Sequence, residues 1–434
     1  MESPFSPCSH FPVCGGCQIL DQDYPAQLRM KEEELRRHFP AAEWPDLHIE
    51  PVLPSPRTEG YRHKVQLPFG LEKQGLSLTV TVGCYAAGSH VVVDQSECLV
   101  QEPGLSRIAW AVRDWAIANQ VPVYREDTRV GWLRHLLLRK GAGTGEILLG
   151  LVTNGPGAGP RDLLPDLLSR CRAALAFSGE GPDGQSPGGQ GPGGQGPGGQ
   201  GPRGGELVGI VQNLNAERTN VVLGGEERLW WGRPHLNEKL GPFLFPVGMS
   251  TFFQVNPFQT PRLYDLAAEA IPAGSRALDL YSGIGTIALW ASRRAGSVLG
   301  IEENPASVQA AVKAAADNGA ANARFLAADV AKALEQPARY LEEAGLPGDA
   351  IASADAVIVD PPRKGLEAPV REALSRLRPR RLVYVSCFPP TLARDARALS
   401  GSLRLVSIAP VDMFPHTRHV ECVAVFDGLE AVHA

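Results

Sequence analysis

Short runs of hydrophobic and β-branched residues alternate with helical patterns from about residue 276 onward. The apolar runs predict strands at 276–281, 297–301, 323–327, 356–359, 381–385, 404–410 and 420–426. Helical patterns lie between them at 286–294, 305–318, 370–377 and 391–399. This alternation is typical of a mostly parallel sheet covered by helices on both faces. Because no helix separates the last two strands, we expect the sheet to end in an antiparallel hairpin.

Further strand patterns precede this region, at 76–85, 89–93, 133–138, 146–152, 209–214 and 220–223. We therefore predict an N-terminal cysteine-containing segment with a helix (1–50), a central α+β domain (51–245) and a catalytic domain (246–434). A Gly-Pro-Gly-Gly-Gln repeat occupies residues 179–205 and has no apolar anchor. Such a tract cannot offset its own ordering entropy, so we interpret it as a flexible surface insertion.

Composition places the chain among soluble globular proteins. Its 434 residues are 44% hydrophobic and 21% charged, with no apolar run long enough to span a membrane and no N-terminal secretory pattern. We expect a cytoplasmic protein without an obligate protein partner. The net charge of −5 weighs against a partner bound mainly through phosphates. Two basic clusters are candidates for a local RNA surface or for an ordinary solvated face: Arg125, Arg129, Arg134, His135, Arg139 and Lys140, and Arg376, Arg378, Arg380 and Arg381.

A glycine-rich turn follows the first predicted strand of the catalytic domain and contains Gly283 and Gly285. Glu302 ends the second strand and Asp329 follows the third, and acidic side chains there can bind ribose and the adenine side of a nucleoside. Each feature alone also fits a tight turn or a helix cap. Together they favour S-adenosylmethionine over NAD or ATP, because the third glycine and the phosphate-loop Lys-Ser/Thr are missing. The seven strands then fit a class I S-adenosylmethionine methyltransferase fold, with a doubly wound sheet.

Cys387 follows Asp360-Pro361-Pro362-Arg363 and precedes Glu421 along the chain. This order predicts covalent chemistry on a nucleobase. C5 of uracil becomes nucleophilic when a thiolate adds to C6, and a base must afterwards remove the C5 proton. We predict that Cys387 is the nucleophile and Glu421 the base, and that the N-terminus of the following helix lowers the pKa of the thiol.

Other interpretations of these residues stay open. Glu421 also fits a surface carboxylate of an edge strand. The Asp-Pro-Pro segment at 360–362 is similar to segments that serve exocyclic-amine methylation, in which case Cys387 is a core residue. A third alternative is a cluster-bearing protein that binds RNA without methyl transfer.

Four of the eight cysteines form a possible metal-binding set: Cys8, Cys14, Cys17 and Cys98. Only one Cys-x-x-Cys pair is present, whereas zinc ribbons usually have two, so a 4Fe-4S cluster is preferred over zinc. Cys84 lies near Cys98 in sequence and competes with it for the fourth position.

The chain resembles the iron-sulfur RNA uracil-C5 methyltransferases that make 5-methyluridine in 23S ribosomal RNA, relatives of the tRNA uridine-54 enzymes. The resemblance rests on residues 8–18, 252–256, 278–286, 360–365, 385–395 and 412–417. It implies a nucleophilic Cys387, a basic Glu421 and a cluster held by the four cysteines named above. It also implies cofactor and substrate contacts from Gln254, Tyr281, Thr286, Glu302, Asp329 and Asp360, beside the two glycines of the turn. A 23S ribosomal RNA substrate is then expected before a tRNA.

Two departures from the family pattern stand out. The chain begins at the cysteine motif, where many ribosomal members first carry a β-barrel RNA-binding module, so we expect other surfaces to grip the RNA. Phe388-Pro389-Pro390 follows Cys387 where Asn-Pro-Ala is expected. The missing amide removes one potential hydrogen bond from the pocket.

Overall fold

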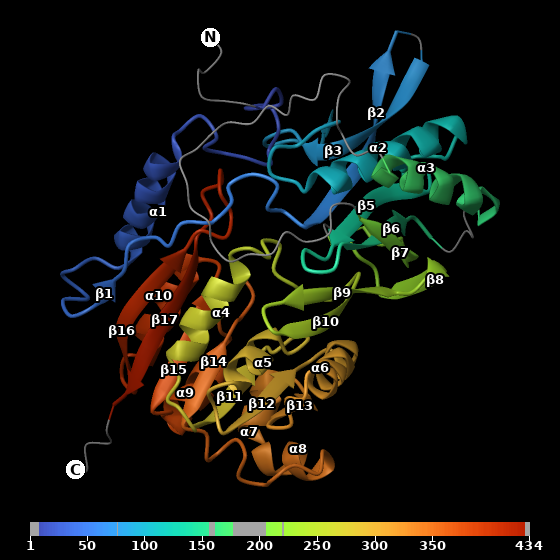
Figure 1. Cartoon of the computed structure of the whole chain (residues 1–434). Coiled ribbons are helices and arrows are strands. Elements are labelled where there is room, and N and C mark those ends of the chain that lie inside the picture. Colours follow the sequence, from blue (N-terminus) through green and yellow to red (C-terminus); the bar gives the residue numbers. More distant parts are fainter. Residues whose placement is uncertain (1–7, 76, 156–160, 177–204, 219–220, 430–434) are drawn as a thin grey trace.

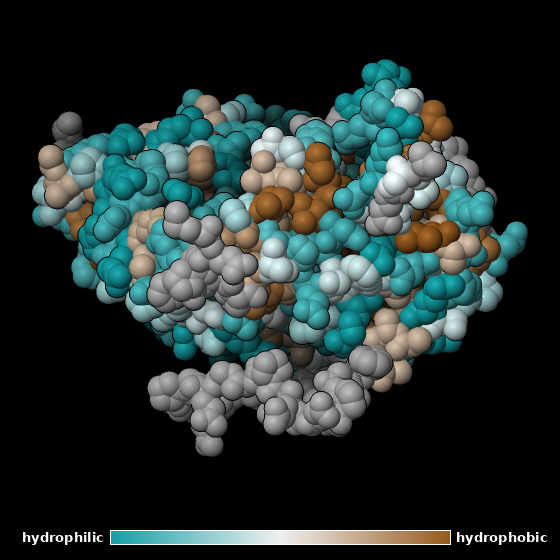
Figure 2. Space-filling view, turned by 90° about the horizontal axis from the view of Figure 1, so that it is seen from above, coloured by the Kyte–Doolittle hydropathy of each residue, from teal (hydrophilic) through white to brown (hydrophobic). Residues whose placement is uncertain are grey.

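Two large β-sheets form the computed structural model, which describes residues 8–75, 77–155, 161–176, 205–218 and 221–429 (Figure 1). Nearly all of the predicted insertion at 179–205 lies outside the described residues. Seen from above, the surface is largely hydrophilic, with hydrophobic residues in small separate areas (Figure 2). In the described parts of the chain, no helix is long and apolar enough to cross a membrane.

The catalytic sheet has eight strands in the order β1-β16-β17-β15-β14-β11-β12-β13. All seven predicted strands are present, with ends displaced by two residues at most: β11 (Arg276–Leu280), β12 (Ser297–Glu302), β13 (Ala323–Ala327), β14 (Ala356–Val359), β15 (Arg381–Ser386), β16 (Leu403–Val411) and β17 (Glu421–Gly428). Strands β11 to β15 pair in parallel, whereas β17 runs antiparallel to both β15 and β16. The predicted class I methyltransferase fold with its terminal hairpin is confirmed.

Helices cover both faces of this sheet (Figure 1). The four predicted helices appear as α5 (Thr286–Ser292), α6 (Pro305–Asp317), α9 (Ala368–Leu377) and α10 (Pro389–Leu399). The structure adds α4 (Thr260–Glu269), α7 (Val330–Glu335) and α8 (Pro337–Glu343), which we did not predict. Neighbouring strand residues such as Val357 and Ile358 belong to separate hydrophobic clusters, because side chains alternate between the two faces. Every central strand is therefore buried on both sides.

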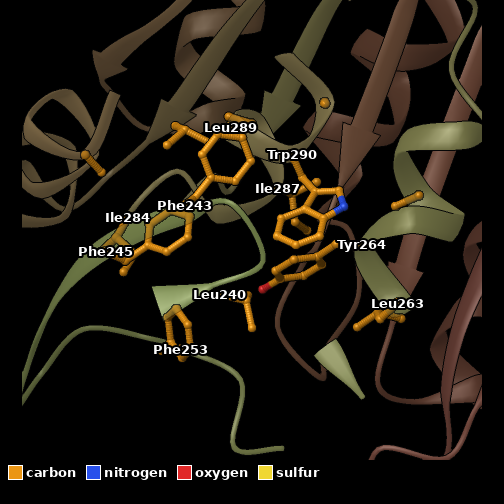
Figure 3. Packing of buried hydrophobic residues seen from close by; sticks show 14 of the residues in the cluster. Leu240, Phe243, Phe245, Phe253, Leu263, Tyr264, Ile284, Ile287, Leu289 and Trp290 are labelled. Atoms are coloured by element: carbon orange, nitrogen blue, oxygen red, sulfur yellow. The ribbon is translucent and has the colours of Figure 1, made fainter. Parts of the chain in front are cut away.

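Aromatic residues fill the core on one face of the catalytic sheet (Figure 3). The ring of Trp290 packs 5.7 Å from those of Phe243 and Tyr264, and Phe245 packs 6.0 Å from Phe253. Phe243 and Phe245 belong to β10 (Phe243–Gly248), which pairs with β9 (His235–Leu240). This core thus packs the β9–β10 hairpin against α4 and α5 of the catalytic domain.

A seven-stranded sheet in the order β4-β3-β2-β5-β6-β7-β8 forms the central part of the chain. Its strands are β2 (Lys64–Gln74), β3 (Ser77–Tyr85), β4 (Val92–Asp94), β5 (Leu133–Lys140), β6 (Glu146–Thr153), β7 (Glu206–Leu214) and β8 (Glu226–Gly232), with α2 (Pro103–Ala118) and α3 (Leu164–Ala176). The strand predicted at 220–223 is wrong for its described residues, 221–223. Asn213 instead binds both the amide and the carbonyl of Gly224, which fixes a turn before β8.

The N-terminal segment packs on the catalytic sheet through α1 (Tyr24–His38) and β1 (His48–Ile49), which extends the sheet beside β16. Lys31 of α1 forms a 2.6 Å ion pair with Asp412 at side-chain exposures of 1% and 0%. Lys31 also donates to the carbonyl oxygen of Phe414, and the Tyr24 hydroxyl donates to Asp412. The turn that leads to β17 is therefore fixed from the N-terminal segment. The domain boundaries at 50 and 245 stay predictions.

Replacing Lys31 with Met should destabilise the fold strongly. The substitution leaves the Asp412 carboxylate buried without its cation, which costs about 3–5 kcal/mol of unfolding free energy. Lys313→Met is the matched control, because Lys313 pairs with Asp317 at side-chain exposures of 59% and 42%. An exposed pair of this kind contributes about 0–1 kcal/mol. Urea unfolding measures both variants, and equal effects would contradict the assigned role of Lys31.

Candidate active site

The glycine turn lies between β11 and α5. Gly283 and Gly285 adopt φ values of +54° and +79°, which favour glycine, and Tyr281 adopts +66° at the end of the strand. A Cβ at Gly283 would meet no heavy atom within 4 Å. The turn is fixed by Glu302, whose carboxylate accepts hydrogen bonds from the amides of Gly283 (3.0 Å) and Asn304 (2.8 Å). The geometry leaves open space where a ligand can approach the backbone.

Other predicted cofactor residues have structural partners as well. Thr286 begins α5 and accepts a hydrogen bond from the buried Tyr264 hydroxyl at 3.1 Å. Asp329 caps α7 by accepting from the amide of Lys332 at 2.8 Å, which is the cap function weighed against its cofactor role. Gln254 is buried and borders a small cavity that residues of the central sheet, including Lys64, also line. The cofactor roles of these three residues stay predictions.

Asp279, which sequence reasoning did not single out, lies beneath the glycine turn in β11 and is 1% exposed. Burial and the nearby Asp360 carboxylate raise the pKa of Asp279 well above its usual value. The amide of Ala288 favours the charged form, but neither carboxylate oxygen has a regular hydrogen bond within the described chain. A buried acceptor at this position fits a polar or cationic ligand over the turn.

Cys387 lies between the end of β15 and the start of α10, as predicted. Asp395 of α10 anchors this region: its buried carboxylate accepts from the Tyr384 hydroxyl at 2.9 Å and from the amide of Leu366 at 2.8 Å. A Cβ at Gly365 would lie 2.5 Å from Asp395, so the loop after Asp360 can approach α10 only with glycine there. The loop and the cysteine are thus held as one unit.

Asp360, Cys387 and Glu421 meet at the carboxyl ends of β14 and β15 and the start of β17. Glu421 is 4% exposed, and burial followed by the Asp360 carboxylate raises its pKa to about 8. Burial raises the pKa of Asp360 to about 7. Because each charge affects the next, the three groups form one electrostatic cluster. Two acids poised near neutral pH beside a thiol are typical of a catalytic centre.

The prediction of a lowered thiol pKa is wrong. Burial, followed by the carboxylates of Glu421 and Asp360, raises the pKa of Cys387 to about 12. Arg363 opposes this rise, and α10 does begin at Pro389, next to the thiol. Desolvation and two negative neighbours outweigh the helix terminus. A positive charge bound beside the thiol would oppose this rise.

Phe388 occupies the position where asparagine is expected. It is the N-cap residue of α10 and makes no side-chain cap hydrogen bond. Its ring instead lies 5.0 Å from the guanidinium carbon of Arg363, a cation–π distance. Arg363 is exposed, and the Thr391 hydroxyl donates to its carbonyl oxygen. Phe388 therefore lacks the amide of asparagine but makes a cation–π contact that positions Arg363 near Cys387.

Replacing Glu421 with Gln should change how stability depends on pH. The pKa of Glu421 is raised from 4.5 to about 8, so the folded state binds this proton more tightly than the unfolded state. The protonated Glu421 side chain therefore contributes its full stabilisation below the pKa of the unfolded state. This contribution is lost as the pH rises toward 8. We expect Glu421→Gln to match the wild type below about pH 4.5 and to exceed it by a margin that grows from there to about pH 8. Urea unfolding across this range tests it, with exposed Glu269→Gln as control, and parallel profiles for all three proteins would refute the assigned pKa.

Five cysteines line one pocket between the N-terminal loop and the central sheet: Cys8, Cys14, Cys17, Cys84 and Cys98. The pocket unites the four predicted ligands and adds Cys84, the competitor noted in the sequence. Cys14 Sγ accepts hydrogen bonds from Gln95 Nε2 (2.9 Å) and the amide of Gly16 (3.3 Å). Its pKa falls to about 6, first through a hydrogen bond with Cys84. Among the described residues, no three His, Cys, Asp or Glu side chains are arranged to hold a single metal ion.

The first basic cluster is mostly structural. Arg139 is buried and donates to the carbonyl oxygens of Met249 and Thr251. Arg134 is buried as well, and Lys140 pairs with Glu102 at 2.7 Å. These three side chains therefore have structural partners, whereas Arg125 and Arg129 are exposed.

Comparison with known proteins identifies the family. The sequence profile described as tRNA (Uracil-5-)-methyltransferase matches residues 243–427. An uncharacterized RNA methyltransferase of Leptospira interrogans (strain Fiocruz L1-130) is 38% identical over 419 residues, which cover 96% of this chain and 98% of the relative. The chain belongs to the tRNA (uracil-5-)-methyltransferase family. A second RNA methyltransferase, from Halalkalibacterium halodurans, is 33% identical over 97% of this chain and 83% of its own length.

A solved member of the uracil-5-methyltransferase family has the same architecture. The Pyrococcus abyssi tRNA (uracil-54, C5)-methyltransferase, in complex with S-adenosyl-L-homocysteine, superposes with a TM-score of 0.70 at 25% identity. The match covers 96% of this chain and 86% of the archaeal protein. The family profile, at 243–427, includes every predicted cofactor and catalytic residue but none of the four cysteines predicted to bind a cluster.

Proposed function

We propose that this protein transfers the methyl group of S-adenosylmethionine to C5 of a uridine in RNA through a covalent adduct on Cys387. The observation that carries the proposal is the convergence of Cys387, Asp360 and Glu421 in a member of the uracil-5-methyltransferase family. The chemistry needs one nucleophile and one base within reach of the same ring. These residues supply both.

The donor would lie over the glycine turn, where the space at Gly283 and the carboxylates of Glu302 and Asp279 favour a nucleoside and a cationic sulfonium. Tyr281, Gly285, Thr286, Asp329, Asp360 and Gln254 are the further contacts that we propose. A sulfonium near Asp360 and Glu421 would offset their charges and so lower the pKa of Cys387. The nucleophile would then become active only when the methyl donor is bound.

The reaction then follows from the residues. The Cys387 thiolate adds to C6 of uracil, and the electron pair of the C5–C6 bond attacks the methyl carbon from C5. S-adenosylhomocysteine leaves with the electrons of its carbon–sulfur bond. The Glu421 carboxylate removes the C5 proton, the C5–C6 double bond forms again, and the thiolate is expelled. Because C5 and C6 are covered in a stacked base, the uridine must leave the stack to reach the buried site.

The thiol pocket is the site that we propose for a 4Fe-4S cluster, which needs four cysteine thiolates. We propose Cys8, Cys14, Cys17 and Cys98 as its ligands, because the thiol set and the N–H donors to Cys14 suit thiolate chemistry. When bound, the cluster would cross-link the N-terminal loop to the central sheet.

Anaerobically purified protein should contain about four iron atoms and four sulfides per chain. We expect Cys17→Ala to lose most of this iron, while Cys171→Ala, a buried thiol of α3, should keep it. Colorimetric iron analysis and visible absorption measure the result. Zinc in place of iron, or full iron content in Cys17→Ala, would contradict the proposed ligand set.

We propose 23S ribosomal RNA as the substrate before tRNA, on the resemblance of the cysteine motif to ribosomal members. The P. abyssi neighbour, a tRNA (uracil-54, C5)-methyltransferase, supports the tRNA alternative. Incubating the purified protein with S-adenosylmethionine and each unmodified RNA decides between them. Digestion to nucleosides and mass spectrometry should reveal 5-methyluridine in one RNA, and a methylated exocyclic amine would favour the alternative chemistry.

A further inference from the structure

An open groove of about 910 Å³ runs along the central sheet beside the thiol pocket. Its walls come from the N-terminal loop, from β2 and from the turn between β3 and β4. None of the described residues that line it is Asp, Glu, Lys or Arg. The volume lies in the range of small-molecule sites, about 300–1,000 Å³. Cys17 and Cys84 line both this groove and the thiol pocket. Because its described lining has no Lys or Arg, the groove is poorly suited to phosphate and better suited to a neutral, planar group.

Aromatic and amide side chains dominate the polar part of this groove. Tyr85 and His90 stack with ring centroids 5.4 Å apart and planes inclined by 28°. Gln66 and Gln18 are exposed along the wall, and Gln18 Nε2 donates to the carbonyl oxygen of Gly15 at 2.9 Å. Flat rings with nearby amides match the way proteins bind unpaired bases, by stacking and by hydrogen bonds to base edges.

A second cavity of about 490 Å³ shares Tyr85, His90 and His135 with the groove. Burial lowers the pKa of His135 to about 4, so the ring of His135 stays neutral at physiological pH. Charged residues line the second cavity, among them Lys73 and Arg125 together with acidic residues. One of these acids, Glu126, reaches the shared wall, with its carboxylate 3.0 Å from His90 Nδ1. This arrangement suits a nucleobase in the groove, with the adjoining sugar-phosphate backbone of the RNA extending toward the acidic and basic residues of the second cavity.

The N-terminal loop connects the groove to the catalytic end. Its residues Gln18 and Ile19 donate backbone hydrogen bonds of 3.0 and 3.2 Å to the carbonyl oxygen of His416. His416 lies in the turn that precedes Glu421. The loop that lines the groove is therefore hydrogen-bonded to the segment that leads to the Glu421 carboxylate.

We propose that this groove binds a second, unpaired nucleotide of the substrate RNA, with its base stacked at Tyr85 and His90. The inference rests on the proposed function, since it names where that substrate is held. It also gives the protein a means of holding RNA that does not depend on a basic surface.

Three variants test the groove. Tyr85→Leu removes the ring but keeps a hydrophobic side chain, and it should weaken binding of a single-stranded RNA substrate about 5- to 100-fold. Tyr85→Phe keeps the ring and should bind like the wild type. Tyr340→Leu is the control, because it removes a ring from α8, at the opposite end of the molecule (Figure 1). Fluorescence anisotropy gives the affinities, and circular dichroism establishes that each variant is folded.

Cross-linking detects RNA bound in the groove without requiring catalysis, so it tests the groove even if the protein transfers no methyl group. RNA with 4-thiouridine at unpaired positions should cross-link under ultraviolet light to the peptide that contains Tyr85 and His90. In an active preparation, Tyr85→Leu should raise KM and leave kcat unchanged. Unchanged affinity in Tyr85→Leu, or cross-links confined to other surfaces, would overturn the inference and leave the groove to a protein partner.

Discussion

Replacing Cys387 with Ala should abolish 5-methyluridine formation, with a loss of at least about 10⁴-fold in kcat. Without the thiolate no enolate forms at C5, and uracil does not attack the sulfonium methyl by itself. Binding of S-adenosylmethionine and RNA should change little, because the side chain is small and half-buried. Single-turnover transfer of a labelled methyl group measures the loss.

Cys171→Ala is the matched control, since it removes a fully buried thiol from α3, away from the catalytic sheet. We expect it to keep wild-type turnover. Substantial activity in Cys387→Ala would show that the cysteine is a core residue. The chemistry would then be direct methylation of an amine beside Asp360.

Replacing Glu421 with Gln should trap the enzyme on its product. Addition of Cys387 and methyl transfer precede the step that needs the base, so the adduct forms while its elimination slows by about 10²–10⁴-fold. A stable protein–RNA complex that already carries the transferred methyl should accumulate. Denaturing electrophoresis with RNA labelled at one end and methyl label on the donor detects it.

The double variant Cys387→Ala, Glu421→Gln separates this outcome from tight non-covalent binding, because it should form no denaturation-resistant complex. Exposed Glu269→Gln should release product normally. Free methylated RNA at the wild-type rate from Glu421→Gln would mean that another group removes the C5 proton. Asp360, whose pKa is raised to about 7, is then the next candidate.

Local patterns predicted the catalytic half of the fold well. Hydrophobic runs between glycine turns marked seven of the eight strands of the catalytic sheet, because buried parallel strands carry continuous apolar residues. The two-residue strand β1 was missed. The same patterns placed Cys387 at a strand end before a helix, which the structure confirms. The short helices α7 and α8 were missed, since two turns of helix give too little periodicity to recognise.

Features that depend on distant parts of the chain could not be read from the sequence. The ion pair between Lys31 and Asp412 joins residues 381 positions apart, and no local pattern relates them. The raised pKa of Cys387 likewise depends on burial and on carboxylates brought from other strands. Cys84 entered the thiol pocket because β3 runs beside the N-terminal loop, a contact that cysteine spacing does not encode.

RNA that carries 5-fluorouridine tests covalent catalysis by Cys387 most directly. Fluorine at C5 cannot leave as a cation, so the methylated adduct cannot eliminate the thiolate and the complex persists. We predict that, in the presence of S-adenosylmethionine, mass spectrometry of the digested complex finds the modified nucleotide bound to Cys387. Efficient methylation of normal RNA without any adduct on Cys387 would contradict the account.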